Sequence, residues 1–248
     1  GYALVTLYYG DIVPDYNAGK RLGVLAIYQH PKYTWGAIGA WAWGLSYVMN
    51  YIERDNRIDA KRVAVIGHSR LGKTALWAGA NDKRFAMVIS NNSGCTGAAI
   101  SRRKVGERFN ILIKIRPYWY APNFSKYNDK EEELAVDQHQ LIALTAPRPI
   151  YVASADLDKN ADPEGEFLGL YYGSEVYKIF NLKGLEKKQM PEVNTPYFSG
   201  QAGYHIRKGK HDITAYDWTQ FLKFADMHLK EHKDAPTRTQ NTADLPVK

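Results

Sequence analysis

Residues 62–74 place a serine at the junction of a strand pattern and a helix pattern. Residues 63–66 are apolar and mostly β-branched, which predicts a buried strand, and residues 73–78 continue as a helix. A strand, a tight turn bounded by glycines and a helix expose one side chain at the edge of a parallel sheet. Here that side chain is Ser69. Backbone N–H groups at the helix N-terminus could hold an oxyanion beside it, so the pattern predicts a serine nucleophile.

The same residues also satisfy the phosphate-binding pattern G-x-x-x-x-G-K-[ST], which runs from Gly67 to Thr74. Bulky residues stand where a phosphate cradle needs small ones, and the next apolar run, 85–90, ends in two asparagines instead of an Asp that could hold Mg²⁺. The serine pattern is irregular too, because Gly72 lies one position later than in G-x-S-x-G. On this pattern alone both interpretations stay open.

A serine hydroxyl needs a general base, because it is a poor nucleophile at neutral pH. His211 is the best placed of the seven histidines, because it follows the last predicted strand and precedes the last helix. This gives the chain order Ser, Asp/Glu, His of α/β-hydrolases. His205 lies inside the strand and is a weaker candidate, whereas His30 and His139 come too early. The alternative for His211 is a loop histidine without a chemical role.

The base in turn needs a carboxylate that orients the imidazole and stabilises the imidazolium. Asp156 and Asp158 both follow the predicted strand 150–153, although either could belong to a solvated acidic loop. Lys73 lies one turn into the helix after the serine. It is either a solvated residue or, if it points to the sheet edge, a donor for substrate hydroxyls or a carboxylate.

A zinc-protease pattern, H-x-x-E-H, lies between His228 and His232. Two histidines in the last turn of a helix interact favourably with the helix dipole and need no metal. The single cysteine, Cys95, excludes an internal disulfide, and cysteine spacing offers no zinc site. We therefore predict neither a metal nor a cofactor.

The composition fits one large domain of 248 residues with 45% hydrophobic content. The net charge of +7 makes association with an acidic polymer easy, but the basic residues form no tract, so nothing indicates nucleic-acid binding. The 18 tyrosines and 6 tryptophans would suit a surface that stacks on sugar rings, although most of them should be core. No apolar run approaches the roughly 20 residues that cross a bilayer.

Strand and helix patterns alternate along the chain, which predicts an α/β fold with a mainly parallel sheet. Residues 101–130 read as an excursion over the sheet rim, and the last residues as a loose tail. The chain opens inside an apparent buried strand, which predicts that sequence precedes it. The expected strands are 3–8, 63–66, 85–90, 150–153 and 203–206, and the expected helices are 35–52, 73–80, 131–144, 167–180 and 216–231.

With these residues in place, the chain resembles the glucuronoyl esterases of carbohydrate esterase family 15, particularly the bacterial ones. The form G-x-S-R-x-G-K is far more specific than a lone serine elbow, and it accounts for both the displaced glycine and the phosphate-loop match. The resemblance extends over nearly the whole chain and rests on the motifs YYGDIVPD (8–15), GHSRLGK (67–73), SNNSGC (90–95), SRR (101–103), VDQH (136–139), ADPEGEF (161–167) and GKHD (209–212).

The resemblance implies an α/β-hydrolase that cleaves the ester joining 4-O-methyl-glucuronic acid of xylan to a lignin alcohol. By matching positions, Ser69 would be the nucleophile and His211 the base, and Arg70 would add its guanidinium to the oxyanion donors. Lys73 and Glu107 would contact sugar hydroxyls. The family implies a secreted or periplasmic enzyme with glucuronoxylan as its partner. We also expect a monomer that binds neither nucleic acid nor membrane.

Two positions depart from the family pattern. Many relatives carry a catalytic Glu in the loop where Asn92 stands here, and an Asn cannot supply negative charge. The acid would then be Asp158, which matches the alternative carboxylate of bacterial members, with Asp156 as the fallback. The sugar-stacking Trp of the family is replaced by Asn160. Asn92 and Asn160 therefore leave two alternatives open beside the nucleotide hydrolase that the phosphate-binding pattern suggests: another carbohydrate or acyl esterase of the same fold, and an inactive carbohydrate-binding relative. We expect residues 1–233 to form a single α/β-hydrolase catalytic domain that lacks some amino-terminal strands, and 234–248 to form the tail.

Overall fold

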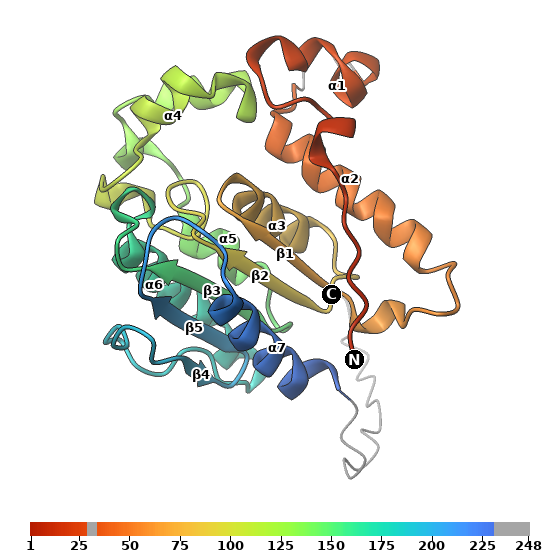
Figure 1. The fold of residues 1–248 in the computed structure, drawn as a ribbon. Coiled ribbons are helices and arrows are strands. Elements are labelled where there is room, and N and C mark those ends of the chain that lie inside the picture. The colour runs from red at the N-terminus through yellow and green to blue at the C-terminus, as the bar shows by residue number, and fades with distance from the viewer. Residues whose placement is uncertain (29–33, 231–248) are drawn as a thin grey trace, which may run out of the picture.

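The structure is a computed structural model that describes residues 1–28 and 34–230. Its centre is a five-stranded sheet in the order β1-β2-β3-β5-β4 (Figure 1). Four strands run parallel and the short β4 pairs antiparallel with β5. The strands are β1 (Ala64–His68), β2 (Met87–Asn91), β3 (Ile150–Ala155), β4 (Tyr197–Ser199) and β5 (Ala202–Arg207). The predicted parallel α/β sheet is confirmed.

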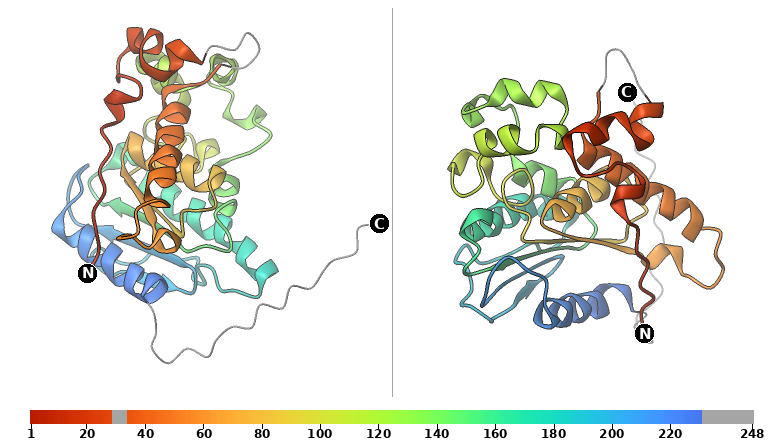
Figure 2. Two further views of the ribbon diagram at one scale, coloured as in Figure 1. Left: turned by 90° about the vertical axis from the view of Figure 1, so that its right-hand side faces the viewer. Right: turned by 45° about the horizontal axis from the view of Figure 1, so that its top comes forward.

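Helices cover both faces of the sheet and give three layers (Figure 2). Val65, Val88 and Val152 pack on one face with the helices α3, α5 and α6, and α2 packs on α3. Alternate strand residues, such as Ile89 and Tyr151, face α7 on the other side. The main helices are α2 (Ala37–Ile52), α3 (Arg70–Asn81), α5 (Gln138–Ala143), α6 (Pro163–Gly173) and α7 (Ala215–Leu229).

The loops at the carboxyl ends of the parallel strands are overlaid by a second cluster of short helices. Residues 101–130 form it together with the amino-terminal segment, and Trp41 and Phe109 lie in its apolar centre. The predicted excursion is therefore a set of short helices (top of Figure 1). The whole cluster, with the amino-terminal segment included, contains α4 (Phe109–Ile115) and α1 (Gly23–Ile27), with the 3₁₀ turns Tyr9–Asp11, Asn17–Arg21, Ser101–Arg103, Pro117–Trp119, Pro122–Tyr127 and Glu131–Glu133.

One predicted strand is wrong, and two predicted helices have different boundaries. Residues 3–8 form no strand and are mostly exposed, because this apolar run has no partner strand within the described residues. The predicted helix 131–144 begins only at Gln138, because Asp137 caps it in a capping box with Gln140. The predicted helix 167–180 begins earlier, with Pro163 in its first turn, and ends as the 3₁₀ segment Ser174–Phe180. The predicted tail, 234–248, lies outside the described residues.

No helix in the part of the chain that the structure describes is both long and apolar enough to cross a membrane. That region also contains no group of three or more His, Cys, Asp or Glu side chains that could hold a metal ion. His228 of the zinc-protease pattern instead packs against Phe224, with ring centroids 4.4 Å apart. His232, its expected partner, lies outside the described residues.

Candidate active site

The serine of the motif stands on a sharp turn between β1 and α3. Ser69 has a positive φ of 58° with a ψ of −127°, a strained backbone conformation that is unusual for a residue with a side chain. Gly67 is required two residues earlier, because a Cβ there would lie 1.9 Å from the carbonyl oxygen of Leu71. At Gly72 a Cβ would lie 2.9 Å from Cβ of Ser93 and 3.1 Å from Oγ of Ser90. The displaced glycine of the motif therefore lets the helix approach the loop after β2.

His211 and Asp158 form a hydrogen-bonded pair at the carboxyl edge of the sheet. The Nδ1 atom of His211 lies 2.6 Å from Oδ2 of Asp158, although 53 residues separate them in sequence. The carboxyl of Asp158 is buried, whereas the ring of His211 is 44% exposed and so remains accessible from outside. Because a carboxylate can only accept, Nδ1 carries the hydrogen and Nε2 is left to accept a proton.

The charges at this pair favour an ionised acid and a basic imidazole. Burial opposes ionisation of Asp158, but hydrogen bonds from His211 and Asn92 outweigh it, and the pKa of the carboxyl is lowered. The hydrogen bond to Asp158 raises the pKa of His211 against the effect of partial burial, and the nearby charges of Glu166 and Glu107 act in the same direction. This is the division of charge that a general base with an orienting acid requires.

The two candidate acids have different partners. Oδ1 of Asp156 accepts a hydrogen bond from the backbone N–H of Gly209 at 2.7 Å. Asp156 therefore ties down the loop that carries His211, while Asp158 contacts the imidazole itself. Asn92 donates its Nδ2 to the same Oδ2 of Asp158 at 2.8 Å. Its amide is a second donor that holds the carboxylate toward His211.

His211 lies beside the serine turn. Its ring packs against that of His68, the residue before Ser69, with ring centroids 4.5 Å apart. The Nδ2 group of Asn91 lies 2.8 Å from Nδ1 of His68 and donates to the carbonyl oxygen of Asp212 at 3.0 Å. Burial, and then the neighbouring His211, lower the pKa of His68 to about 4, so this ring is neutral at neutral pH. The loops after β1, β2, β3 and β5 thus meet at one corner.

The guanidinium of Arg70 is held by the amino-terminal segment. Its Nε forms an ion pair with Asp15 at 2.8 Å, and Nη2 donates to the hydroxyl of Tyr9 at 2.8 Å. Asp15 also accepts hydrogen bonds from Trp119 and Tyr118, which belong to the overlying cluster. Arg70 is therefore fixed over the turn. Its backbone N–H belongs to the first turn of α3, where N–H groups have no partner within the helix.

Lys73 is buried and holds the loop after β2. Its Nζ lies within hydrogen-bond distance of the carbonyl oxygens of Ser93 and Cys95, at 2.6 and 2.5 Å. On the other side of this loop, Glu166 accepts the N–H of Gly94 at 2.9 Å. Two of the three N–H groups of the ammonium thus serve the protein itself. This buried lysine does not line an open phosphate cradle, which argues against the nucleotide-binding interpretation.

Glu107 lies next to the loop that carries Asp158. Its backbone N–H donates to the carbonyl oxygen of Asn160 at 2.9 Å, and its side chain is partly buried. The negative charge of Glu107 acts on both Lys73 and His211. Its contact with a sugar hydroxyl stays a prediction, as does that of Lys73.

Three residues of this corner are absent from the sequence prediction: His68, Asn91 and Glu166. His68 and Asn91 end the observed strands β1 and β2 and lie just beyond the predicted strands 63–66 and 85–90, so their positions near strand ends are the available indication. Glu166 lies within the motif 161–167, whose pattern does not distinguish it from its acidic neighbours. The rival His205 is fully buried and contacts Tyr151 and Asp217 instead of the serine turn. His30 lies outside the described residues.

A parallel sheet with helices on both faces, a strained serine turn and a His–Asp pair after later strands define the α/β-hydrolase class. The comparisons with known proteins agree. The family model "Glucuronyl esterase, fungi" matches residues 1–181. The carbohydrate esterase MZ0003 from an unknown prokaryotic organism is 51% identical over 92% of this chain and 54% of its own length. The 4-O-methyl-glucuronoyl methylesterase of Hypocrea jecorina is 32% identical over 64% of this chain and 36% of its own.

Solved structures show the same relationship. The glucuronoyl esterase from Solibacter usitatus superposes with a TM-score of 0.85 at 49% identity, over 90% of this chain and 58% of that protein. A CE15 esterase from a marine bacterial metagenome superposes with a TM-score of 0.83 at 52% identity, over 89% and 57%. The chain belongs to the glucuronoyl esterase family, carbohydrate esterase family 15. The chain spans about half the length of the carbohydrate esterase MZ0003, which it matches over 92% of its own residues.

Proposed function

We propose that this chain carries the catalytic machinery of a serine carboxylesterase that hydrolyses esters of 4-O-methyl-glucuronic acid, such as those joining xylan to lignin alcohols. The pair formed by His211 and Asp158 beside the Ser69 turn is the observation that carries the proposal. Family membership supplies the substrate class, because the relatives named above are glucuronoyl esterases and methylesterases.

The proposed reaction uses these residues in turn. Ser69 Oγ attacks the uronoyl carbonyl carbon while Nε2 of His211 takes the hydroxyl proton, and Asp158 stabilises the resulting imidazolium. The N–H of Arg70 and its guanidinium face the tetrahedral oxyanion. The intermediate expels the alcohol, which receives its proton from His211. Water then attacks the acyl-enzyme with His211 again as base, and Ser69 regains its proton.

Hydrolysis of benzyl glucuronate by the purified chain tests this proposal. We expect turnover by the wild-type chain, loss of turnover in Ser69→Ala, and a glucuronoyl adduct on Ser69 in rapidly acid-quenched samples analysed by mass spectrometry. Ser93→Ala is a serine control, because Ser93 bonds to Glu166 and Ser90 inside the protein. Turnover that survives in Ser69→Ala would refute the assignment of the nucleophile.

A broader esterase activity is a second candidate. One solved relative at 52% identity is described as a promiscuous CE15 esterase, and Asn160 replaces the sugar-stacking Trp of the family. Comparison of kcat/KM for benzyl glucuronate and for p-nitrophenyl acetate separates the two. Substrate discrimination of less than about tenfold, which corresponds to about 1.4 kcal/mol, would favour the broader activity.

The remaining expectations concern the setting of the enzyme. We propose that the protein acts as a monomer on glucuronoxylan outside the cytoplasm, because its substrate is a polymer of plant cell walls. The basic net charge of +7 favours approach to acidic glucuronoxylan. Sedimentation of the purified chain with and without the polysaccharide measures both the oligomeric state and the association.

A further inference from the structure

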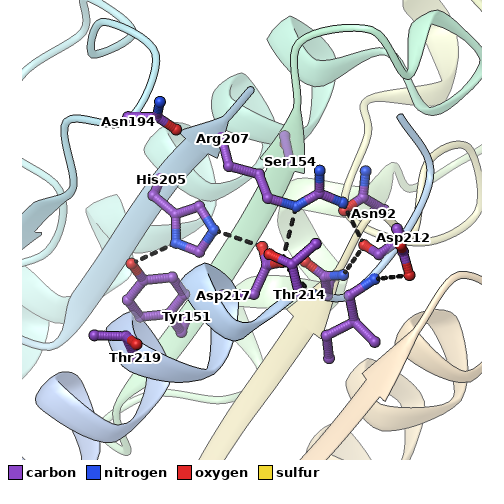
Figure 3. Close-up of polar contacts among 12 residues, drawn as sticks. Asn92, Tyr151, Ser154, Asn194, His205, Arg207, Asp212, Thr214, Asp217 and Thr219 are labelled. Atoms are coloured by element: carbon purple, nitrogen blue, oxygen red, sulfur yellow. Dashed lines mark hydrogen bonds and ion pairs between the residues drawn. The ribbon is translucent and has the colours of Figure 1, made fainter. Parts of the chain in front are cut away.

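A chain of buried polar side chains connects β3, β5 and α7 directly behind the loop that carries His211 (Figure 3). The Tyr151 hydroxyl lies 2.9 Å from Nδ1 of His205, and Nε2 of His205 lies 2.9 Å from Oδ1 of Asp217. The second oxygen of Asp217 accepts Nε of Arg207 at 2.8 Å. The four side chains, buried between the sheet and α7, form a continuous network.

Arg207 ends this network at the loop of residues 208–212. Its Nη2 donates to the carbonyl oxygen of Lys210 at 2.8 Å and to that of Asp212 at 2.6 Å. These two carbonyls belong to the residues immediately before and after His211. Nη1 adds a longer bond to the carbonyl of Lys208 at 3.3 Å. One planar, buried guanidinium therefore holds the backbone on both sides of His211.

The network also fixes the orientation of Arg207. Asp217 is fully buried, and its Oδ2 accepts Thr214 N–H and Oγ1 in addition to Arg207, at 2.6 and 2.7 Å. Burial opposes ionisation of Asp217, but hydrogen bonds from His205 and Thr214 outweigh it and lower its pKa. The pKa of His205 is lowered too, but here burial is the cause. The ring therefore stays neutral and donates through Nε2. The single negative charge of Asp217 thus balances the single positive charge of Arg207.

We propose that Arg207, oriented by Asp217, is a positioning residue for His211 that fixes the imidazole between Asp158 and the Ser69 turn. The proposal rests on the proposed function of His211 as general base. A buried ion pair is weak evidence for a role in stability, because desolvation offsets most of its attraction. Arg207 of this pair also holds the carbonyls on both sides of His211, so the pair can position the imidazole. A misplacement of a catalytic group by about 1 Å can cost about a hundredfold in rate.

Arg207→Lys is the main test, because it keeps the buried charge beside Asp217 but loses the planar fork that reaches two carbonyls. We expect kcat for benzyl glucuronate to fall about 10- to 100-fold with KM within about twofold, since Arg207 touches no substrate. In Arg207→Ala, millimolar guanidinium ion should restore part of kcat. In Arg207→Lys, NMR titration should show the pKa of His211 falling toward the ordinary histidine value, because its contact with Asp158 loosens.

Arg148→Lys is the matched control. Arg148 also donates to several backbone carbonyls, those of Gly79, Phe85 and Leu144 among them, but it lies at the amino end of β3. We expect Arg148→Lys to lower Tm without changing kcat or the His211 pKa. An equal loss of kcat in both lysine variants, or an unchanged His211 pKa in Arg207→Lys, would overturn the proposal. If the wild-type chain showed no turnover, the proposed function would fail, and the NMR titration would still decide whether Arg207 positions His211.

Discussion

Removal of the negative charge at Asp158 is the most direct test of the site. Asp158→Asn is nearly isosteric. In the wild type, Asn92 and His211 both donate hydrogen bonds to Oδ2 of Asp158. When the NH₂ group of the new asparagine faces His211, two donors cannot bond to each other. The variant therefore favours the tautomer of His211 in which Nδ1 accepts. Nε2 then carries the hydrogen and cannot take the proton of Ser69. The variant removes both the charge and the correct tautomer.

The size of the effect follows from the geometry. Two unit charges about 4 Å apart attract by about 1 kcal/mol in bulk water and about 4 kcal/mol at an effective dielectric constant of 20. The ring of His211 is 44% exposed and the carboxyl of Asp158 only 6%, so an intermediate value of about 2–3 kcal/mol applies to the imidazolium. This corresponds to about 30- to 150-fold. The wrong tautomer raises the total loss of kcat toward about 10³- to 10⁴-fold.

The assay is hydrolysis of benzyl glucuronate, with Asp156→Asn as the matched control. Asp156 uses Oδ1 to accept the N–H of Gly209, and an asparagine oxygen can do the same. We expect Asp156→Asn to keep kcat within about threefold, a difference below about 1 kcal/mol. A pH profile of Asp158→Asn should place the residual acid limb lower than in the wild type. Comparable activity of Asp158→Asn and wild type, or a larger loss in Asp156→Asn, would refute this account of the acid.

Three further predictions concern pH, the serine turn and Asn92. The kcat/KM of the wild type should rise through an apparent pKa above the ordinary 6.5, because His211 must be neutral to act and Asp158 raises its pKa; a limb below 6.5 would contradict this. Gly67→Ala should lower the free energy of unfolding by more than about 3 kcal/mol in urea titrations, because the new Cβ would meet the Leu71 carbonyl oxygen at 1.9 Å. Gly39→Ala should be neutral or stabilising, because its Cβ would meet only Nε1 of Trp77, in ordinary contact at 3.9 Å. Asn92→Gly tolerates the local φ of 47° and removes one donor to Asp158, so kcat should fall about tenfold; an unchanged kcat would show that the amide is dispensable.

Acid sensitivity of the fold is a fifth expectation and depends on His205. Its pKa is lowered by burial in the folded state, so the unfolded chain binds more protons as pH falls below 6.5. The contribution of this group to stability is therefore present above pH 6.5 and is lost as pH falls toward the lowered native value. Urea midpoints at pH 7.5, 6 and 5 should decline more steeply for the wild type than for His205→Gln. Parallel declines would assign the acid sensitivity to other groups.

The sequence predicted the sheet and the serine turn well because their patterns are local. The strand 63–66 and the helix after it are set by a few neighbouring residues, and G-x-S-R-x-G-K is a specific motif. Residues 3–8 misled because an apolar, β-branched run indicates a strand only where a partner strand is available. The short strand β4 was missed, since three residues carry too little pattern to be recognised.

Pairs brought together by the fold were harder to predict than single residues. The choice between Asp156 and Asp158 depended on the path of one loop, and two positions of sequence separate a residue that contacts the imidazole from one that contacts backbone. The contact of Arg207 with Asp217 was invisible for a similar reason. A Thr and an Asp three positions later do mark the start of α7, and Thr214 and Asp217 form its capping box. The same Asp serves the arginine on β5, which no local pattern reveals.

The side chains of Asn92 and Asp158 meet at Oδ2 of Asp158, beside His211. This meeting has a consequence for how such enzymes diverge. Side chains that follow two different strands, β2 and β3, reach the same place. The carboxylate that stabilises the imidazolium could therefore be supplied from either loop. A lineage could transfer the carboxylate from one loop to the other through an intermediate that carries both, without moving the nucleophile or the base. The exchange variant Asn92→Glu with Asp158→Asn would re-create the other arrangement in a single protein.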